Sequence, residues 1–270
     1  MGILDYFDRL AIIHLPDRKD RYRALARELS RIGIDIKGSK VSIPDPPMPE
    51  TANGFTSRGV YGSFLSHLEI IESAYRDGLD TVWVLEDDAI FSKRFQMQQL
   101  TIAEYLRANE WDQLFIGHTV SEKLPVSPTG LVRYSGPFVW AHCYAVHRRI
   151  MPRLIEYLRK NIDREVGHPE GGKMYIDACY HFFRRFNPEV ICVVSSPCLS
   201  VQKGSPSSLN SQQWYQKSAF GALLNLGRGI RDEGWRQGLW RIDGPQFAPN
   251  IELQSSRAQT WPSAHDPARV

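Results

Sequence analysis

The chain has 270 residues, of which 42% are hydrophobic and 23% charged, and its formal net charge at pH 7 is +3. This length suits one large domain or two small ones, and the small net charge does not indicate nucleic-acid binding, which usually shows a concentrated basic face. No apolar run approaches the ~20 residues of a membrane span. The N-terminus carries an acidic residue and no basic leader, so no secretory signal is expected and we predict a cytoplasmic protein.

The first half of the chain predicts two strands and two helices. An apolar run at 10–15 predicts a strand, and the helix after it is marked by Tyr22, Leu25, Leu29 and Ile32 and closed by Gly33. Four prolines predict an extended loop at 43–49, and 53–59 is turn-like. A second helix follows, ending at 77–78, and the uniformly apolar run at 81–85 predicts a strand buried on both faces.

The pattern continues with helices alternating with strands. Helical spacing is seen at Met97, Leu100, Ala103 and Leu106, then in the stretch that starts at Met151, and again from Ile176 to Phe183. Further strands are predicted at 113–116, 139–146 and 190–194. This alternation predicts an α/β fold with a mainly parallel central sheet flanked by helices.

Three segments follow from the change in composition near residue 210. We assign 8–210 to one catalytic domain, 211–241 to a basic amphipathic C-terminal segment, and 242–270 to a weakly ordered tail. The four cysteines are Cys143, Cys179, Cys192 and Cys198. They stand too far apart for a Cys-x-x-Cys motif. We interpret them as small buried hydrophobic residues, with a disulfide or ligand role as the alternative.

The most informative residues are three consecutive carboxylates, Glu86-Asp87-Asp88, directly after the strand at 81–85. Neighbouring buried carboxylates repel one another unless a cation or solvent relieves them, and ligands of open α/β sheets bind at the carboxyl ends of strands. Mg²⁺ or Mn²⁺ prefers one or two carboxylates plus phosphate oxygens. In an extended chain Glu86 and Asp88 would share one side, opposite Asp87. We interpret the triplet as a divalent-metal site, with an acidic loop or helix N-cap as the alternative.

Three blocks in order carry a family resemblance. They are Ile-Ile-His-Leu-Pro-Asp-Arg-Lys-Asp-Arg at 12–21, Arg-Gly-Val-Tyr-Gly-Ser-Phe-Leu-Ser-His-Leu at 58–68, and Val-Leu-Glu-Asp-Asp-Ala at 84–89. Weaker echoes follow at 111–117, 141–146, 175–177 and 197–202. Together, over about residues 10–208, they resemble glycosyltransferase family 25, known from lipooligosaccharide and collagen glycosyltransferases.

The resemblance implies a GT-A-like domain that transfers a sugar from a nucleotide-sugar donor with inversion. UDP-galactose is the donor it favours, and Mn²⁺ or Mg²⁺ would bridge the triplet to the donor diphosphate. Such a cation would stabilise the charge that develops on the leaving group. On this interpretation Asp88 is the direct metal ligand and a catalytic residue, Glu86 is a ligand or a contact behind it, and Asp87 lies on the donor side.

Further donor-binding residues are expected from the other blocks: Leu15, Asp17, Arg18, Arg58, Gly62, Ser66, His67 and Gln202. Arg18, favoured over Arg21, could reach a phosphate or the base, although a solvated helix face is the alternative for both. Gly62 would allow close approach of a ligand to the backbone. A buried, hydrogen-bonded helix residue is the alternative for His67.

An inverting transfer needs a base for the acceptor hydroxyl. Asp177 is the candidate because it matches the family's late Asp before a helix, although Tyr175 departs from an Asp-x-Asp pattern, and a first-turn Asp is the alternative. The acceptor would be a glycan or lipid-linked glycan of surface polysaccharide biosynthesis. The basic, Trp-rich stretch at 214–241 fits either an anionic membrane surface or packing on the domain.

Two rival functions stay open on the sequence. One is an inactive nucleotide-sugar or glycan-binding module of the same fold. The other is a different phosphate-handling α/β enzyme that uses the same carboxylates with a metal. Against the second, the sequence has neither a P-loop nor a Ser–His nucleophile elbow.

Overall fold

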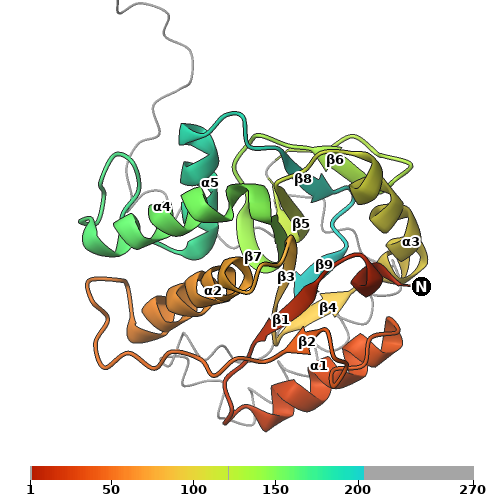
Figure 1. Cartoon of the computed structure of the whole chain (residues 1–270), viewed down its shortest axis with the longest axis horizontal. Coiled ribbons are helices and arrows are strands. Elements are labelled where there is room, and N and C mark those ends of the chain that lie inside the picture. Colours follow the sequence, from red (N-terminus) through yellow and green to blue (C-terminus); the bar gives the residue numbers. More distant parts are fainter. Residues whose placement is uncertain (1, 121, 204–270) are drawn as a thin grey trace, which may run out of the picture.

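The computed structural model describes residues 2–120 and 122–203 (Figure 1). In this part of the chain the helices are α1 (Lys19–Arg31), α2 (Arg58–Arg76), α3 (Lys93–Ala108), α4 (Met151–Asp163) and α5 (Ile176–Phe186), with 3₁₀ turns at Ile3–Asp5 and Arg148–Ile150. The strands are β1 (Arg9–Ile13), β2 (Val41–Ser42), β3 (Thr81–Glu86), β4 (Ala89–Phe91), β5 (Gln113–Thr119), β6 (Leu131–Arg133), β7 (Val139–His147), β8 (Cys192–Ser195) and β9 (Ser200–Gln202).

These strands form one sheet in the order β2-β1-β3-β7-β5-β8-β6, with β4 and β9 paired beside it. β1 runs parallel to β2 and β3, and β5 runs parallel to β8 and β9. β7 lies antiparallel between β3 and β5 and joins the two parallel groups. The predicted α/β fold with a mainly parallel sheet flanked by helices is confirmed, with β7 reversed at its centre and with β6 and β4 antiparallel to β8 and β9.

The sheet separates two hydrophobic cores, and alternation along β3 shows which side chain faces which core. Val82 and Val84 pack in the core that includes residues of α2, α4 and α5, whereas Trp83 and Leu85 pack in the core that includes residues of α1 and α3. Both sets are fully buried, as the uniformly apolar sequence of this strand predicts. In Figure 1, α2, α4 and α5 lie together on one side of the sheet, away from α1.

Several boundaries differ from the sequence-based expectation. Helix α2 begins at Arg58, because the Ser57 hydroxyl accepts a hydrogen bond from Val60 N at 3.1 Å, so the segment expected to be a turn already contains the helix start. On α3 the buried face carries Phe95 and Ile102, while Met97 and Leu100 are exposed. The short strands β2, β4, β6 and β9 were not predicted.

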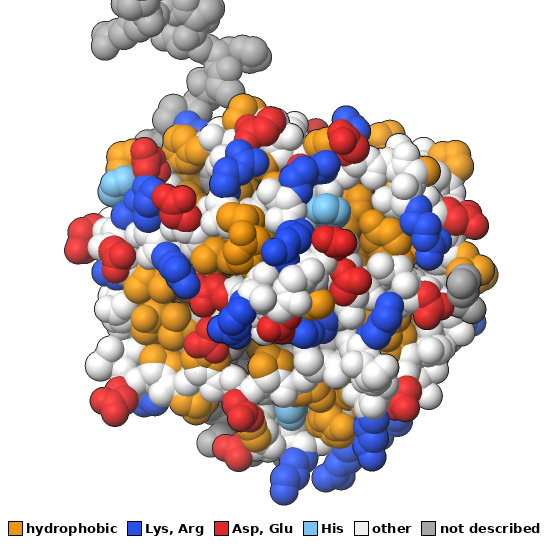
Figure 2. All heavy atoms as spheres, in the orientation of Figure 1, with side chains coloured by type: hydrophobic (Ala, Val, Ile, Leu, Met, Phe, Trp, Pro, Cys, Tyr) orange, Lys and Arg blue, Asp and Glu red, His pale blue; other side chains and the backbone are white. Residues whose placement is uncertain are grey.

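The packed unit begins before the expected boundary at residue 8, since Ile3 and Phe7 are fully buried in the core on the α1 side. Its described part ends at residue 203, so the predicted segments 211–241 and 242–270 lie outside the described residues. Among the described helices, each is too short or too polar to cross a bilayer. Figure 2 shows basic and acidic side chains interspersed over the face drawn there.

Candidate active site

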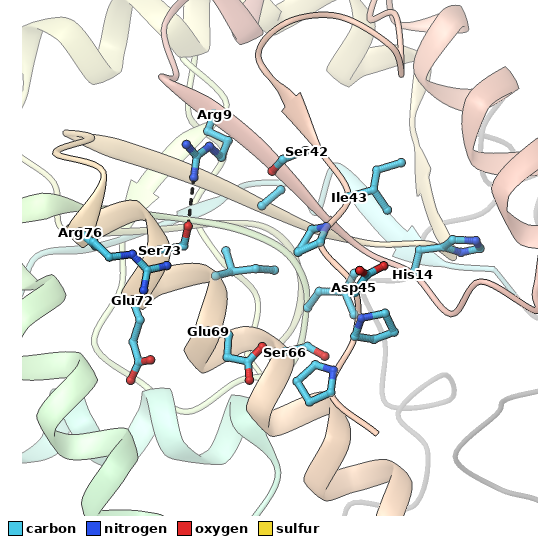
Figure 3. A pocket seen from close by; sticks show the side chains of 16 residues that line it. Arg9, His14, Ser42, Ile43, Asp45, Ser66, Glu69, Glu72, Ser73 and Arg76 are labelled. Carbon is cyan, nitrogen blue, oxygen red and sulfur yellow. Dashed lines mark hydrogen bonds between the residues drawn. The ribbon is translucent and has the colours of Figure 1, made fainter. Parts of the chain in front are cut away.

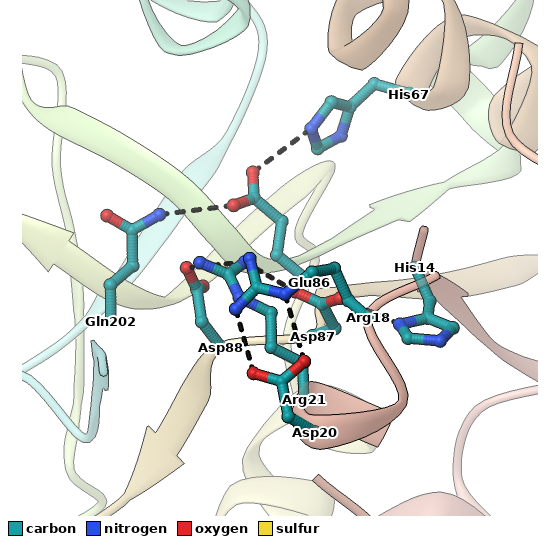
Figure 4. Close-up of polar contacts among 9 residues, drawn as sticks. All are labelled: His14, Arg18, Asp20, Arg21, His67, Glu86, Asp87, Asp88 and Gln202. Atoms are coloured by element: carbon teal, nitrogen blue, oxygen red, sulfur yellow. Dashed lines mark hydrogen bonds and ion pairs between the residues drawn. The ribbon is translucent and has the colours of Figure 1, made fainter. Parts of the chain in front are cut away.

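The carboxylate triplet lies where β3 ends, and its first two side chains diverge (Figure 4). Glu86 continues the side of Val82 and Val84, so it points toward α2, whose His67 Nε2 lies 3.4 Å from Glu86 Oε1. Asp87 takes the opposite side and meets α1. The predicted separation of these two carboxylates follows directly from strand alternation.

Asp87 is buried and held from two elements. His14 Nδ1, just after β1, lies 2.8 Å from one of its oxygens, and Arg21 Nη1 of α1 lies 2.7 Å from the other. The Asp87 backbone N–H also donates to Ile13 O at 3.1 Å. The sequence placed Asp87 among the donor-binding residues, and the structure shows that its carboxylate ties β3 to β1 and α1.

Asp88 lies at the turn after β3 rather than beside Glu86 on an extended chain, because the strand ends at Glu86 and β4 begins at Ala89. Its Oδ2 is 3.3 Å from Arg21 Nη1, while its buried Oδ1 has no hydrogen-bond partner in the described structure. Burial and the neighbouring Glu86 carboxylate raise the pKa of Asp88 to about 7 against the opposing charge of Arg21. Asp88 therefore offers a free carboxylate oxygen in a charge-crowded position.

Glu86 is the most open of the three, with 26% of its side chain exposed. Gln202 Nε2 donates to its Oε2 at 3.1 Å. Burial opposes its ionisation, but the pKa of Glu86 is lowered because His67, His142 and Gln202 together outweigh that cost. Glu86 is thus held as a carboxylate from the α2 side and the β9 side.

Gln202 reaches Glu86 because the last described strand folds back on the strand after the triplet. β9 pairs antiparallel with β4, with Ala89 opposite Gln202, and Lys203 N donates to Asp88 O at 2.6 Å. The expected contact of Gln202 with the donor stays a prediction. The structure brings this residue to the carboxylate cluster by a strand pair that the sequence analysis missed.

His67 is fully buried behind Glu86 rather than open to a ligand. Its Nδ1 lies 2.8 Å from Tyr144 Oη, and Tyr180 Oη donates to Tyr144 Oη at 2.6 Å. This chain of buried polar groups links α5 and β7 to the carboxylate through α2. The structure thus shows His67 as the buried, hydrogen-bonded helix residue of the alternative, and its donor contact stays a prediction.

The turn after β1 carries three of the predicted donor-binding residues. Leu15 O accepts from Arg18 N at 2.8 Å, and Asp17 is exposed. Arg18 pairs with Asp20 through two hydrogen bonds of 3.0 and 2.9 Å, which lower the pKa of Asp20 to about 2. The arginine that contacts the triplet is Arg21, the less favoured of the two in the sequence analysis.

The second sequence block supplies the N-terminal half of α2, but not all of it faces the triplet. Arg58 Nε donates to Pro49 O at 3.1 Å, and it precedes His67 by about 13 Å of helix axis. A Cβ on Gly62 would lie 3.2 Å from Pro47 O. Gly62 therefore admits the proline-rich segment against α2, and its predicted contact with a ligand stays a prediction.

A cavity of about 450 Å³ lies between α2, β1 and the segment after β2 (Figure 3). Ser66 and His14 both line it, and His14 also contacts Asp87, so the cavity adjoins the carboxylate triplet. The Ser66 hydroxyl donates to Gly62 O within the helix. The remaining lining mixes charged and apolar groups, among them Arg9, Ser42, Ile43, Asp45, Glu69, Glu72, Ser73 and Arg76.

Asp177 lies in the first turn of α5, and both of its carboxylate oxygens accept backbone N–H groups. Trp140 N donates to Oδ2 and Ala178 N to Oδ1, each at 2.9 Å. Burial raises the pKa of Asp177 against these two bonds, and the Glu86 carboxylate adds to the rise. The structure brings Asp177 within electrostatic reach of the triplet, and its role as a base stays a prediction.

His142 lies behind the triplet and was not among the site residues expected from the sequence. It is fully buried on β7, its Nε2 lies 3.3 Å from Ser200 Oγ, and the Glu86 charge acts on it. Burial lowers the pKa of His142 to about 4. The glycine at 117 could have signalled this packing, since a Cβ there would lie 2.3 Å from His142 Nε2.

The donor set fits a divalent cation only in part. Within the described residues no group of three or more His, Cys, Asp or Glu side chains is arranged to hold a metal ion. Asp88 does supply an unpartnered carboxylate oxygen of the hard kind that Mg²⁺ and Mn²⁺ prefer. Such an ion would need its remaining ligands from the donor phosphates and water. None of the four cysteines forms a disulfide within the described residues, and three of them are buried.

The structure is an α/β domain with acidic side chains at a strand end near a cavity, and comparison with known proteins indicates its class. Residues 50–178 match the family model described as glycosyltransferase family 25 (LPS biosynthesis protein). The match confirms the resemblance found in the sequence and supports a glycosyltransferase.

A curated human relative, "Inactive glycosyltransferase 25 family member 3", is 29% identical over 171 residues, covering 52% of this chain and 27% of that protein. The chain thus spans about a quarter of the length of this relative. Similar solved structures include a glycosyltransferase involved in the glycosylation of the major capsid of PBCV-1 (TM-score 0.43, 11% identity, 83% of this chain and 97% of that chain). Another is mannose-1-phosphate geranyltransferase from Thermus thermophilus (TM-score 0.41, 13% identity, 69% and 72%).

Proposed function

We propose that this protein is an inverting glycosyltransferase that moves a sugar from a UDP-sugar, with galactose favoured, to a glycan or lipid-linked glycan of surface polysaccharide biosynthesis. The observation that carries the proposal is the unpartnered Asp88 Oδ1 at the end of β3. The neighbouring Asp87 contacts His14, which also lines the cavity of about 450 Å³. The family match over residues 50–178 supports the same interpretation.

The sheet order suggests how the donor would lie. The cavity is on the β1 and β2 side of β3, and it offers Ser66 and other polar groups for a nucleoside. A diphosphate extending from it would reach the end of β3, where Asp88 would hold Mn²⁺ or Mg²⁺ with Glu86 beside it. When bound, this cation would neutralise charge that develops on the leaving diphosphate.

The chain's own groups would do the rest. Glu86 is kept ionised by His67 and Gln202, so it presents a fixed negative charge to the reacting sugar. Asp177 would take the acceptor proton. Asp177→Asn tests this assignment, because an asparagine oxygen can still accept from Trp140 N, although its amide nitrogen would then face Ala178 N, and the side chain can no longer serve as a base.

The first experiment is calorimetric binding of UDP with and without Mn²⁺ to the full chain, to Asp88→Asn and to Glu104→Gln. Glu104 is an exposed acid of α3 and serves as the matched control. We expect Mn²⁺ to strengthen UDP binding to the wild type and to Glu104→Gln, and to have no such effect on Asp88→Asn. Metal-independent binding of equal strength in all three would refute the bridging role.

A second candidate is a nucleotide-sugar or glycan-binding module without turnover, and the inactive human relative favours it. Sugar release from a panel of UDP-sugars, with and without acceptor glycans, separates the two candidates. Release or transfer that is lost in Asp88→Asn supports the transferase. UDP-sugar binding without any release supports the module.

A further inference from the structure

Trp140 has the most unusual backbone near the site. Its φ is +74°, in the left-handed region that a bulky side chain rarely adopts. Its position in β7 lies next to the irregular register between β5 and β7, where shifts occur on both sides of Gly117. Such irregularities often re-aim a side chain beside an active site, and strained residues cluster at such sites.

The strained backbone is held in place by the site itself. Trp140 N donates to Asp177 Oδ2 at 2.9 Å, and Asp177 is fixed in turn by Ala178 N. A carboxylate that accepts two backbone N–H groups is a strong anchor. A buried acidic side chain therefore keeps this backbone turned.

The indole is not used to fill the interior. Trp140 is only half-buried, and it is absent from both hydrophobic cores and from the partly buried residues packed against them. Its aromatic contact is His142, with ring centroids 6.1 Å apart in a T-shaped arrangement. Trp140 is a large aromatic side chain outside the core, on a backbone with an unfavourable conformation. These two features together point to a contact with a ligand.

The same strand geometry puts the indole beside the carboxylates. The ring contact with His142 places the indole near this residue although the backbone at Trp140 is irregular. Leu85 lies opposite Cys143, so the pairing carried one residue further sets Glu86 beside His142. Because β3 lies between β1 and β7, Trp140 is on the far side of the triplet from the cavity.

We infer that the half-buried face of Trp140 is a platform for a pyranose ring of the acceptor, and that Asp177 positions this platform through the Trp140 backbone. The inference rests on the proposed function, which puts the nucleoside in the cavity on the other side of the triplet. An indole stacks on the apolar face of a neutral sugar ring.

The test uses the full chain labelled with 5-fluorotryptophan, with the Trp140 resonance assigned by its loss in Trp140→Phe. The probes are methyl β-galactoside, methyl β-glucoside and, separately, UDP with Mn²⁺. We expect at least one glycoside to shift the Trp140 resonance and UDP to leave it in place. A shift with UDP alone would make Trp140 a nucleobase contact and overturn the proposal. No shift with either glycoside, in protein that binds UDP by calorimetry, would overturn it without touching the proposed function.

Two variants separate a platform from a structural residue. Glycine adopts the left-handed conformation freely, so Trp140→Gly should unfold at a higher temperature than Trp140→Ala. In a transfer assay both should raise the acceptor KM by ~10-fold or more with little change in the donor KM. Phe186→Ala removes an exposed aromatic on α5 and is the control. Equal losses of acceptor and donor affinity in both Trp140 variants would refute the platform.

Discussion

The substitution Gly117→Ala should crowd His142, which lies behind the carboxylate triplet. A Cβ there would lie 2.3 Å from His142 Nε2, 2.4 Å from His142 Cε1 and 3.0 Å from Ser200 O, all closer than an ordinary contact. His142 is fully buried between β7 and β9 and has no open direction in which to move. Overpacking of this kind costs about 1–3 kcal/mol. For a domain of this size that is roughly 3–10 °C in the unfolding midpoint.

The assay is thermal and urea unfolding of Gly117→Ala in two backgrounds, wild type and His142→Ala. If the clash with the imidazole is the cause, the cost of Gly117→Ala should fall by more than half when His142 is truncated, leaving the contact with Ser200 O. Gly2→Ala is the control, since its Cβ would meet only Gln99 Oε1, at 3.6 Å. An equal cost in both backgrounds would refute the reasoning.

Three further predictions concern charged groups. Asp8→Ala should lose about 1–3 kcal/mol in urea unfolding, because Asp8 Oδ2 accepts three hydrogen bonds from the backbone and hydroxyl at the start of β3; an unchanged midpoint would contradict this. Arg21→Ala should lower the free energy of unfolding by about 3–5 kcal/mol, because it removes the positive charge beside the Asp87 and Asp88 carboxylates. Arg18→Ala, at a more exposed ion pair, should lower it by about 0–1 kcal/mol. Equal losses in the two variants would contradict the observed contacts. With chelator present, Asp88→Asn should stabilise the protein increasingly from pH 4 to pH 8. The raised pKa of about 7 means that the folded Asp88 keeps a proton that the unfolded chain releases above its ordinary pKa of 3.8. If the extra stability of Asp88→Asn over the wild type decreased as the pH rises, the prediction would be contradicted.

Elements with strong periodicity were predictable from the sequence. The buried strand at 81–85 and the helical spacing from Tyr22 to Ile32 each impose one dominant pattern, and the structure has β3 and α1 there. The start of α2 was not predicted, because the two glycines at 59 and 62 are typical of turns. Their helical position depends on the Ser57 cap and on the packing of the proline-rich segment.

Parts of the site depended on contacts between distant residues. Gln202 approaches Glu86 through a three-residue strand pair, and a strand that short leaves little periodicity to detect. The positive φ of Trp140 follows from its bond to Asp177, 37 residues later, and not from its own side chain. The sequence therefore predicted which carboxylates form the cluster, but not which groups hold them.

The three acids of the triplet have different roles because of strand alternation. Asp87 points to the α1 side, where His14 and Arg21 occupy both of its oxygens, so its charge joins β3 to β1 and α1. Glu86 and Asp88 keep their positions because Asp87 holds the strand end in place. Arg21 also contacts Asp88, and a guanidinium there must compete with any cation that Asp88 would bind. The first sequence block thus supplies a counter-charge beside the carboxylates, and the donor contacts expected of Leu15, Asp17 and Arg18 stay predictions.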